Sequence, residues 1–524
     1  MNNTTYESIP KEQFAFVNEG ERIHDKKLDD KPVSYMRDAF NRFCKSKAAV
    51  VAAIIIILIM LFSVLAPILI TSHDSTLMVS TYAKKAPRIK LLDTLGIDTG
   101  YTTETFSEKT LIKALAIGVA AEDTEGTGDV TIAEGMESDY QPILKITSET
   151  TTINPNKTES TTYEAHYENY YSVGFMYKTI EQDEYQAILE WQEETGLQVL
   201  YPLIADNDYN IDATDANNWY KSVKGTPVSV DEDGNVTKLS LSDDLVLEDN
   251  YLRDADGNVK YYTYSGGGTA DTAMYKVRVL YYNYYQYLYD SEPYYLFGTD
   301  SQGYDLALRL AGGLRLSIGL AIAISLINFV LGALYGAIEG YYGGAIDIIL
   351  ERVSDILADV PFVVVATLFQ IHLAGKVGPV PSLLFAFVLT GWIGIAARVR
   401  TQFYRFKNQE YVMAARTLGA KDRRIIWKHI FPNTLGTIIT SCALIIPGVI
   451  TSESMLSYLG IVKLGTAEVT SLGTLLSDAS SIWTNYPHLL WFPAIFLSLL
   501  MICFNLFGNG LRDAFNPSLR GVEE

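Results

Sequence analysis

Long uncharged apolar runs alternate with one long polar stretch along the chain. Residues 48–70 and 316–338 each hold 23 residues without a charged side chain. An α-helix rises ~1.5 Å per residue, so either run can cross the ~30 Å hydrocarbon layer of a bilayer. Further spans are predicted over residues 353–372, 377–397, 437–459 and 489–511. The pattern predicts an α-helical membrane protein with six transmembrane helices.

The polar stretch, residues 71–296, separates the first two predicted spans and is called the insert below. It mixes β-rich runs, such as residues 275–289, with a helical pattern over residues 179–194. In that pattern Ile180, Ile188, Leu189 and Trp191 can share one face. We therefore expect a folded α/β domain inserted between transmembrane helices 1 and 2.

Two near-repeats in the insert, residues 231–236 and 254–259, each contain an Asp-Gly pair. Asp-Gly is typical of hairpin turns, which need positive φ. A calcium loop is the alternative interpretation, but neither copy supplies the full set of ligands that an EF-hand loop requires.

Charge is concentrated in the insert. The whole chain has 41 Lys and Arg and 61 Asp and Glu, a net charge of −20, which excludes a nucleic-acid binder driven by overall basicity. Residues 71–300 hold 39 acidic and 16 basic residues, a net charge of −23, so the remainder of the chain sums to +3. Cys44, Cys442 and Cys503 all lie outside the insert, so no disulfide can stabilise it.

The distribution of Lys and Arg predicts the orientation in the cell membrane. With six spans, both termini and the links after spans two and four share one side, and these short segments are rich in bases. The opposite short links offer only Lys376 and Lys463. Basic segments stay in the cytosol, so the N- and C-termini are expected there and the insert outside. Residues 1–47 would form a loosely ordered cytosolic tail with a short surface helix over residues 34–47.

The most informative cytosolic link is the basic segment 398–433. Glu410 to Leu418 can form a helix with Ala414 and Ala415 on one side, and Gly419 suits a C-cap because it lacks a Cβ. A second helix over residues 420–430 would follow, and Pro432 would mark the entry to span five. The segment predicts a rigid helix-turn-helix knob for contact with another protein, although a solvated basic loop remains an alternative.

This segment resembles the "EAA" signature of ABC-importer permeases, which pairs two alanines with a later Gly and Pro, here Ala414, Ala415, Gly419 and Pro432. Met413 departs from it, since the signature has an acid there. The resemblance points to the dipeptide/oligopeptide/nickel branch and its oligopeptide permease C type. Further motifs that agree, in the same order along the chain, lie at residues 297–305, 340–347, 456–460 and 507–520.

The resemblance implies a type I ABC importer permease fold, with residues 297–524 forming the permease core together with the first span. It also implies that segment 398–433 is a coupling loop seated on a cytosolic ATPase. The coupling residues carried over are Glu410, Ala414, Ala415, Arg416, Leu418 and Gly419. Small residues would permit close packing, Leu418 would supply an apolar contact, and the charges would lie at the rim.

The implied partners are a second permease subunit, two ABC ATPase subunits, an extracellular substrate-binding lipoprotein and the lipid bilayer. The chain has no phosphate-binding G-x-x-x-x-G-K-[ST] loop, so it is expected to be a transporter subunit and not an enzyme. No cofactor is expected in this chain, because ATP and Mg²⁺ would bind the partner ATPases. Its six scattered histidines lack paired metal-ligand spacing.

Three features in or beside the predicted spans carry open interpretations. Glycines at 332, 336, 340 and 344 recur every four residues, which favours internal helix packing, with pairing to a second permease as the alternative. The acids at 347, 351, 355 and 359 favour compensation of a helix dipole, with Arg352 as a counter-charge. Glu453 either lines the pathway or snorkels near the outer end of span five, because a buried acid in a span is costly.

The sequence thus predicts a permease subunit of an ATP-driven peptide importer, forming half of the pathway. A membrane receptor with an extracellular ligand-sensing domain is the rival of a different class. Import of nickel or another small solute is the rival within the family.

Overall fold

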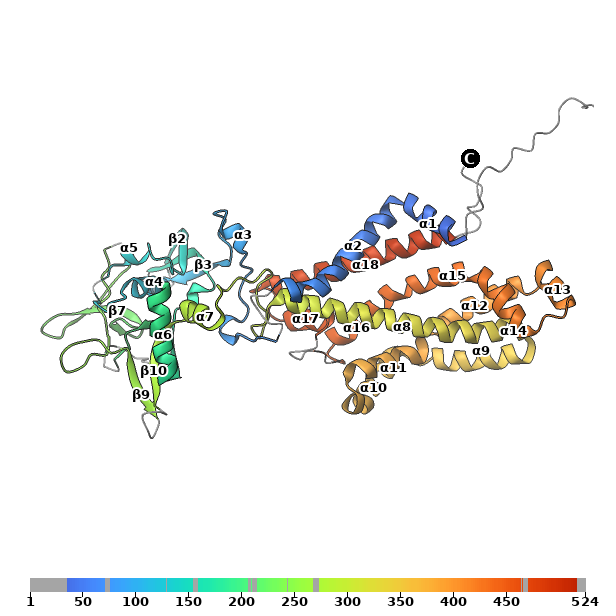
Figure 1. The fold of residues 1–524 in the computed structure, drawn as a ribbon. Helices are drawn as coiled ribbons and strands as arrows, with labels where there is room; N and C mark the ends of the chain where they lie inside the picture. Colours follow the sequence, from blue (N-terminus) through green and yellow to red (C-terminus); the bar gives the residue numbers. More distant parts are fainter. Residues whose placement is uncertain are drawn as a thin grey trace, which may run out of the picture.

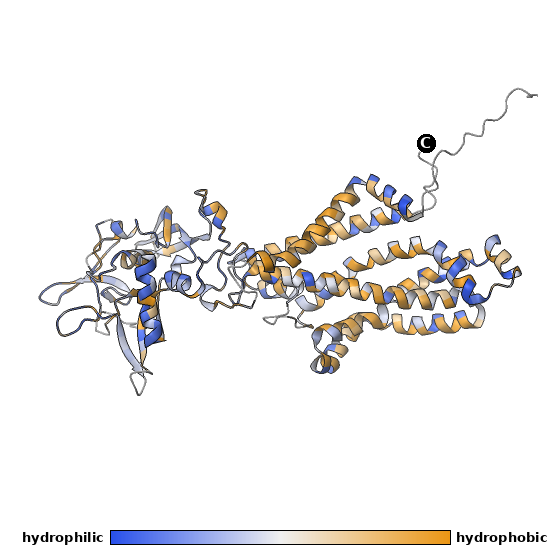
Figure 2. Ribbon diagram, in the orientation of Figure 1, coloured by the Kyte–Doolittle hydropathy of each residue, from blue (hydrophilic) through white to orange (hydrophobic). Residues whose placement is uncertain are grey.

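The computed structural model describes residues 35–70, 76–128, 130–153, 159–205, 209, 214–242, 244–266, 273–462, 464 and 470–515. It has two parts that lie end to end, a mixed α/β body and a bundle of long helices (Figure 1). Apolar residues dominate the bundle, whereas the α/β body is mainly hydrophilic (Figure 2). The predicted tail over residues 1–34 lies outside the described residues.

The bundle is formed by the helices that precede and follow the insert. Their bounds are α1 (Tyr35–Lys45), α2 (Lys47–Leu69), α8 (Leu306–Tyr342), α9 (Gly344–Ala358), α10 (Phe362–Val377), α11 (Pro379–Gly391), α12 (Ile393–Phe406), α13 (Glu410–Thr417), α14 (Asp422–Arg424), the π-helical turn η6 (Ile425–Ile430), α15 (Phe431–Ala443), α16 (Ile445–Tyr458), α17 (Leu472–Ala479) and α18 (Pro487–Phe515).

Among the described residues, five helical segments are long and apolar enough to cross a membrane. They are Lys47–Leu69, Leu306–Tyr342, Pro379–Phe406, Ile438–Tyr458 and Pro487–Phe515. The bent pair α9 and α10 raises the number to six if it counts as one span. The prediction of a multi-pass helical membrane protein is confirmed.

The third predicted span, residues 353–372, is wrong as a single straight helix. α9 and α10 meet at an angle of 73°, with the break between Ala358 and Phe362. Pro361 lies at this break and caps α10. Proline has no backbone N–H and its ring clashes with the preceding turn, so a helix cannot continue through it undisturbed. The apolar pattern continues across the break and therefore concealed it.

The glycine repeat lies where α8 packs against α12. A Cβ on Gly336 would lie 2.2 Å from the backbone oxygen of Ala396, and one on Gly332 or Gly340 would lie within 2.7 Å of α12 atoms. Internal packing, the favoured interpretation, is therefore confirmed for these three glycines. Gly344 does not belong to the groove, because it starts α9 with φ of 59° and a Cβ there would meet no atom within 4 Å.

The described residues of the insert form three small antiparallel sheets, ordered β1-β3-β2, β4-β10-β5 with β9 also on β10, and β6-β7-β8. The strands are β1 (Tyr101–Ser107), β2 (Ile143–Ile153), β3 (Glu159–Glu168), β4 (Phe175–Glu181), β5 (Leu200–Tyr201), β6 (Ser222–Val223), β7 (Thr226–Val230), β8 (Val236–Lys238), β9 (Tyr262–Gly266) and β10 (Met274–Leu280).

Helices pack on these sheets and complete two buried apolar clusters. They are η3 (Ser80–Tyr82), α3 (Lys90–Asp93), α4 (Glu108–Glu122), α5 (Ile132–Gly135), η4 (Tyr171–Val173), α6 (Gln182–Thr195) and α7 (Tyr281–Tyr289). α4 is buried along most of its length, from Leu111 to Ala121. The insert therefore has its own core, as an α/β domain needs.

Two boundaries within the insert differ from the prediction. Ile180 lies in β4 and not in the helix, because α6 begins only at Gln182. The β-rich run over residues 275–289 is a strand only as far as Leu280, after which α7 begins. Tyr281, Tyr282, Tyr284 and Tyr285 are all buried. That spacing suits a helix. The high β-propensity of tyrosine does not by itself produce a strand, because packing against neighbours decides the conformation.

Both Asp-Gly segments form turns. Gly234 has φ of 81° between β7 and β8, and Gly257 has φ of 90° inside the bridge that joins Arg253 to Val259. In each turn the leading aspartate, Asp231 or Asp254, accepts hydrogen bonds from backbone N–H groups two and four residues later. These carboxylates stabilise turns, as the favoured interpretation predicts.

Candidate functional site

The candidate coupling site lies in the loop between α12 and α15, at the end of the bundle remote from the α/β body (Figure 1). Gln409, with extended backbone, precedes α13, and Glu410 occupies the first helical turn. An acid there is stabilised by the helix dipole, and so is Arg416 in the last turn. The charged side chains at both ends of α13 therefore complement its helix dipole.

Gly419 ends this helix in the way the sequence predicted. Its φ is 82°, a conformation that favours glycine. The Ala420 N–H donates to the Ala415 carbonyl at 3.0 Å, and the Gly419 N–H donates to the Arg416 carbonyl at 3.0 Å. These two bonds form a Schellman motif, which satisfies the last carbonyls of the helix.

Val412 attaches α13 to the bundle through apolar contacts. It is fully buried in a cluster with Ile425 and Ile426 of η6 and Phe403 of α12. Apolar burial of this kind fixes the helix on the end of the bundle and leaves its other faces in solvent. The loop is therefore a packed protrusion.

Tyr341 of α8 links α13 to α14 within the protrusion. Its hydroxyl donates to Asp422 at 2.5 Å and accepts from the Arg416 guanidinium at 3.4 Å. Arg416 was predicted to supply charge at the rim, and the structure also gives it this contact inside the chain. Tyr341 is a contributor that the sequence did not single out.

The remaining predicted coupling residues face outward. Leu418 is 88% exposed, and Glu410, Ala414, Arg416 and Gly419 are also exposed, while Ala415 is half-buried. Leu418 makes an apolar tip beside small residues. An exposed leucine at the tip of a fixed protrusion is suited to enter a pocket on another protein.

The segment after α13 differs from the single helix predicted over residues 420–430. A short α14 leads into the π-helical turn η6, which continues into α15 without interruption. The backbone N–H of Phe431 donates to the Ile426 carbonyl, five residues back. A π-turn widens the helix, so Pro432 at the start of α15 is accommodated instead of ending the helix.

Glu453, the candidate pathway residue, is 1% exposed and lies between α16 and α8. Its carboxylate accepts hydrogen bonds of 2.9 Å from Ser317 and 2.9 Å from Ser457, and one of 3.4 Å from Ser454. The snorkelling interpretation is wrong, because the side chain is directed into protein. A role for Glu453 in the pathway stays a prediction.

An ion-pair cluster that the sequence did not reveal links α9 to α12. The Arg400 guanidinium donates to Asp347 at 2.6 and 2.9 Å and to Glu351 at 2.7 Å. Arg352, the predicted counter-charge, instead reaches Asp355 on the exposed side at 3.1 Å. Asp347 does lie in the first turn of α9, as a compensated dipole requires. The bidentate geometry makes Arg400 the main partner of Asp347 and Glu351.

Two family profiles match the chain. Residues 34–87 match the N-terminal TM domain of oligopeptide transport permease C, and residues 331–521 match the binding-protein-dependent transport system inner membrane component. The oligopeptide transport system permease protein OppC of Bacillus subtilis is 42% identical over 225 residues, which cover 43% of this chain and 72% of that protein. The chain belongs to the family of OppC- and DppC-type permeases.

Other relatives of this OppC-type permease agree. The OppC protein of Haemophilus influenzae is 44% identical over 44% of this chain and 72% of its own length. The dipeptide transport system permease protein DppC of Bacillus subtilis is 41% identical over 43% of this chain and 69% of its own length. An inward-facing MetNI methionine ABC transporter structure covers 40% of this chain and 96% of its own, at 15% identity and a TM-score of 0.34.

Residues 88–330 of this OppC-type permease lie outside both matched ranges, and they contain most of the insert. Two antiparallel segments attach the insert to the bundle. Arg88 bridges to Tyr295, and the Lys84 N–H donates to the Asp300 carbonyl at 2.9 Å. The Lys85 N–H donates to the hydroxyl of Thr299 at 2.8 Å. These bonds form a stem directly before α8.

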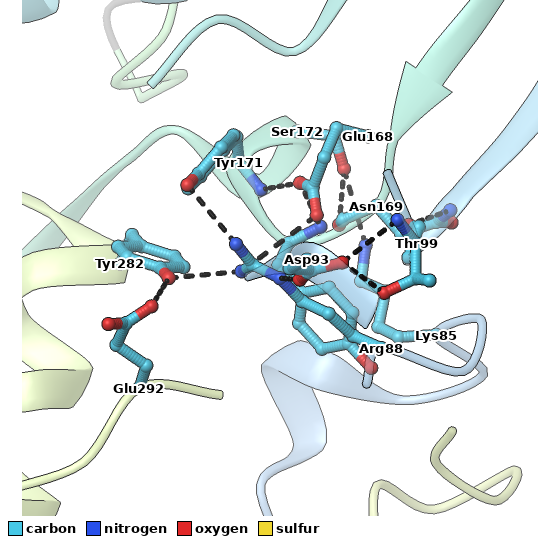
Figure 3. A network of polar contacts seen from close by, with 12 residues as sticks. Lys85, Arg88, Asp93, Thr99, Glu168, Asn169, Tyr171, Ser172, Tyr282 and Glu292 are labelled. Atoms are coloured by element: carbon cyan, nitrogen blue, oxygen red, sulfur yellow. Dashed lines mark hydrogen bonds and ion pairs between the residues drawn. The ribbon is translucent and has the colours of Figure 1, made fainter. Parts of the chain in front are cut away.

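Arg88 organises the base of the insert (Figure 3). Its guanidinium donates to the hydroxyls of Tyr282 at 3.0 Å and Tyr171 at 3.2 Å, and to Asp93 at 3.3 Å. Glu168 lies 3.9 Å away. Acidic neighbours and tyrosine hydroxyls raise the pKa of Arg88 although burial lowers it, so the guanidinium stays charged.

Glu168 is buried near this arginine, and Lys85 is half-buried beside them. Loss of hydration raises the pKa of Glu168 to about 7, although Arg88 and two backbone N–H groups, of Tyr170 and Tyr171, counteract the rise. Loss of hydration also lowers the pKa of Lys85 to about 8. The attachment of the insert therefore contains groups that titrate near neutral pH.

Proposed function

We propose that this chain is one permease subunit of an ATP-driven importer of peptides with a type I ABC importer fold. It would form half of the translocation pathway beside a second permease. Two cytosolic ABC ATPases would bind ATP and Mg²⁺, and an extracellular lipoprotein would deliver the substrate. The observation that carries this proposal is the identity of about 40% to proteins named oligopeptide and dipeptide transport permeases.

The geometry of the 398–433 loop supports the ATPase-coupling part of this proposal. α13 is fixed by Val412, ends at a glycine cap and presents Leu418 at its tip. A fixed protrusion can transmit motion from a partner into the bundle, since α13 packs on the cluster that contains α8 and α12 residues. Its position opposite the insert also agrees with cytosolic termini and an external insert.

Co-purification and reconstitution test this function. A complex containing this chain, its second permease, two ATPases and the binding lipoprotein should take up a labelled peptide only with ATP. A chain that captures no ATPase and supports no uptake would favour the receptor alternative. Uptake of Ni²⁺ without peptide uptake would favour the small-solute alternative.

A matched pair of surface variants tests the coupling contact. Leu418→Asp places a charge at the exposed tip, where it should abolish ATPase binding without unfolding the chain. Leu95→Asp makes the same change at a similarly exposed leucine of the insert, which is 68% exposed. It should leave ATPase binding unchanged. Equal ATPase binding by both variants would contradict the coupling role.

We propose that the insert orients the binding lipoprotein or gates the outer mouth of the pathway. The stem supports this, because backbone bonds from residues 84–88 to 295–300 attach the insert firmly at the start of α8. A short Gly-Ser linker joining Arg88 to Tyr295 would remove the insert and keep the bridged pair. Unchanged uptake and unchanged affinity for the lipoprotein would rule the role out.

A further inference from the structure

Helix α9 is attached to the rest of the bundle mainly by polar contacts. Its two buried side chains, Asp347 and Ser354, are both polar, and its two leucines are only half-buried. Its isoleucines face outward, with exposed fractions of 63% for Ile349 and 69% for Ile356. Burial of an apolar face normally fixes a helix on its neighbours. In α9, which is described throughout, ion pairs and hydrogen bonds take over this task.

Arg400 of α12 makes four hydrogen bonds to α9. Its Nε and Nη2 donate to the two carboxylate oxygens of Asp347 at 2.6 and 2.9 Å. Its Nη1 and Nη2 donate to the two oxygens of Glu351, one turn further along α9, at 2.7 and 3.0 Å. Glu339 of α8 lies 3.7 Å from the same guanidinium. One arginine therefore forms two bidentate pairs with α9 at a junction of three helices.

Both ends of α9 are points where the chain can bend. Gly343 and Gly344, which join α9 to α8, have φ of 65° and 59°. Glycine adopts this left-handed conformation without steric cost, and small residues commonly form the hinges between helices. At the other end, the 73° bend at Pro361 separates α9 from α10. A helix with such joints at both ends takes its position from its lateral contacts.

Arg400 lies on the helix that leads into the coupling loop. Only residues 407–409 separate α12 from α13, and both helices lie at the same end of the bundle as α9 (Figure 1). Phe403 of α12 belongs to the apolar cluster that contains Val412 of α13. A Cβ on Gly340 would lie 2.7 Å from the Arg400 carbonyl oxygen, so α8 and α12 are in close contact at this level. A displacement of α13 thus reaches α12 directly and α9 through Arg400.

We propose that Arg400 is a positioning residue that makes span three, formed by α9 and α10, follow the coupling helix during transport. When the ATPases displace α13, α12 would move with it, and the pairs of Arg400 with Asp347 and Glu351 would carry α9 along. Lysine would not replace Arg400, because an ammonium group lacks the planar fork that makes bidentate pairs. The inference rests on the proposed ATP-driven transport and adds a route by which the motion reaches span three.

Peptide uptake per ATP hydrolysed, measured with the assembled transporter in proteoliposomes, tests this role. Arg400→Gln should lower the ratio about two- to thirty-fold, the range found for residues that carry coupling between distant sites. ATPase binding should be retained, because the exposed face of α13 is unchanged. Arg400→Lys should also lower the ratio, since it keeps the charge and loses the fork.

Two further variants accompany the measurement. Glu351→Gln weakens one of the two pairs at a side chain that is 38% exposed, so it leaves no buried charge unpaired and should lower the ratio less than Arg400→Gln. It decides the question together with Arg400→Lys if Arg400→Gln does not assemble. Arg352→Gln is the matched control, because it removes the exposed ion pair with Asp355 within α9 and should leave the ratio unchanged. Unchanged ratios in both Glu351→Gln and Arg400→Lys would overturn the proposal.

Distances between two spin labels separate this role from general destabilisation. The labels are placed at Ile349→Cys in α9 and Asn408→Cys after α12, both at exposed positions, in a chain whose three native cysteines are replaced. With Arg400 intact, the distance should be the same without nucleotide and with ATP and vanadate. In Arg400→Lys, it should change only with ATP and vanadate.

Three outcomes of the distance measurement would contradict the proposal. They are a nucleotide-dependent change with Arg400 intact, an unchanged distance in Arg400→Lys, and a change in that variant that is already complete without nucleotide. The last would indicate a purely structural role for the ion pairs. Wild-type complex without ATP-driven peptide uptake would overturn the proposed function and this inference with it, whereas normal wild-type uptake with any of the three outcomes overturns the inference alone.

Discussion

The hydroxyl of Ser317 donates a hydrogen bond of 2.9 Å to the carboxylate of Glu453, which joins α8 to α16 inside the bundle. Ser457 donates to the same carboxylate from one turn further along α16. Glu453 is thus an acceptor shared by two helices. Removal of a shared buried acceptor leaves hydroxyl groups without a partner.

Glu453→Ala should therefore destabilise the folded chain by about 1 to 3 kcal/mol, and Glu453→Gln should cost less because its amide oxygen still accepts. Unfolding of the purified complex in detergent, followed by heat or denaturant, measures both. Met455→Ala, at an exposed position of the same helix, is the control. Equal losses in the Ala and Gln variants would show that the hydrogen bonds contribute little.

Gly336→Ala should separate α8 from α12, because a Cβ at this position would lie 2.2 Å from the Ala396 carbonyl oxygen. Overpacking of this kind typically costs about 1 to 3 kcal/mol. Gly448→Ala is a matched control in α16, where a Cβ would meet no atom within 4 Å. It should be neutral or stabilising. Thermal unfolding of the two variants provides the comparison, and equal stability would argue against close packing at Gly336.

Gly419→Leu should uncouple ATP hydrolysis from uptake, because a side chain in the left-handed region strains the cap that positions Leu418. Gly196→Leu imposes the same strain at the cap of α6, with φ of 73° and no atom within 4 Å of a Cβ. The measurement is peptide uptake per ATP hydrolysed in proteoliposomes. Only the Gly419 variant should lower this ratio, and an equal effect of both would indicate general destabilisation.

The stability of the insert should depend on pH through Glu168 and Lys85. Glu168 keeps its proton in the folded state up to about pH 7, whereas its ordinary pKa is 4.5. The folded state therefore binds the proton more tightly, so the free energy of unfolding falls as pH rises from 4.5 to about 7, by at most about 3 kcal/mol. The lowered pKa of Lys85 makes stability rise again from about pH 8 to 10.5.

Hydrogen exchange of the Tyr170 and Tyr171 amides, which donate to Glu168, reports this change once intrinsic exchange rates are corrected. Glu168→Gln should flatten the acid limb of the pH profile. A pH profile that persists unchanged in Glu168→Gln would assign the titration to another group.

The apolar runs and the EAA-like motif were sufficient to predict the membrane class, the family and the glycine-capped helix that ends at Gly419. These features depend on local properties: hydropathy sets whether a helix can lie in lipid, and a missing Cβ sets where it can end. The Asp-Gly turns of the insert were predictable for the same reason. The conformation of each of these turns depends on only a few neighbouring residues.

Only the tertiary structure decided which distant residues pair. Arg400 lies about fifty residues after Asp347 along the chain, and nothing in the local pattern selected it over Arg352. The helical conformation of residues 281–289 likewise depends on burial of tyrosines in the insert core. Such choices follow from which groups the fold brings together and removes from water, and a linear pattern does not contain that information.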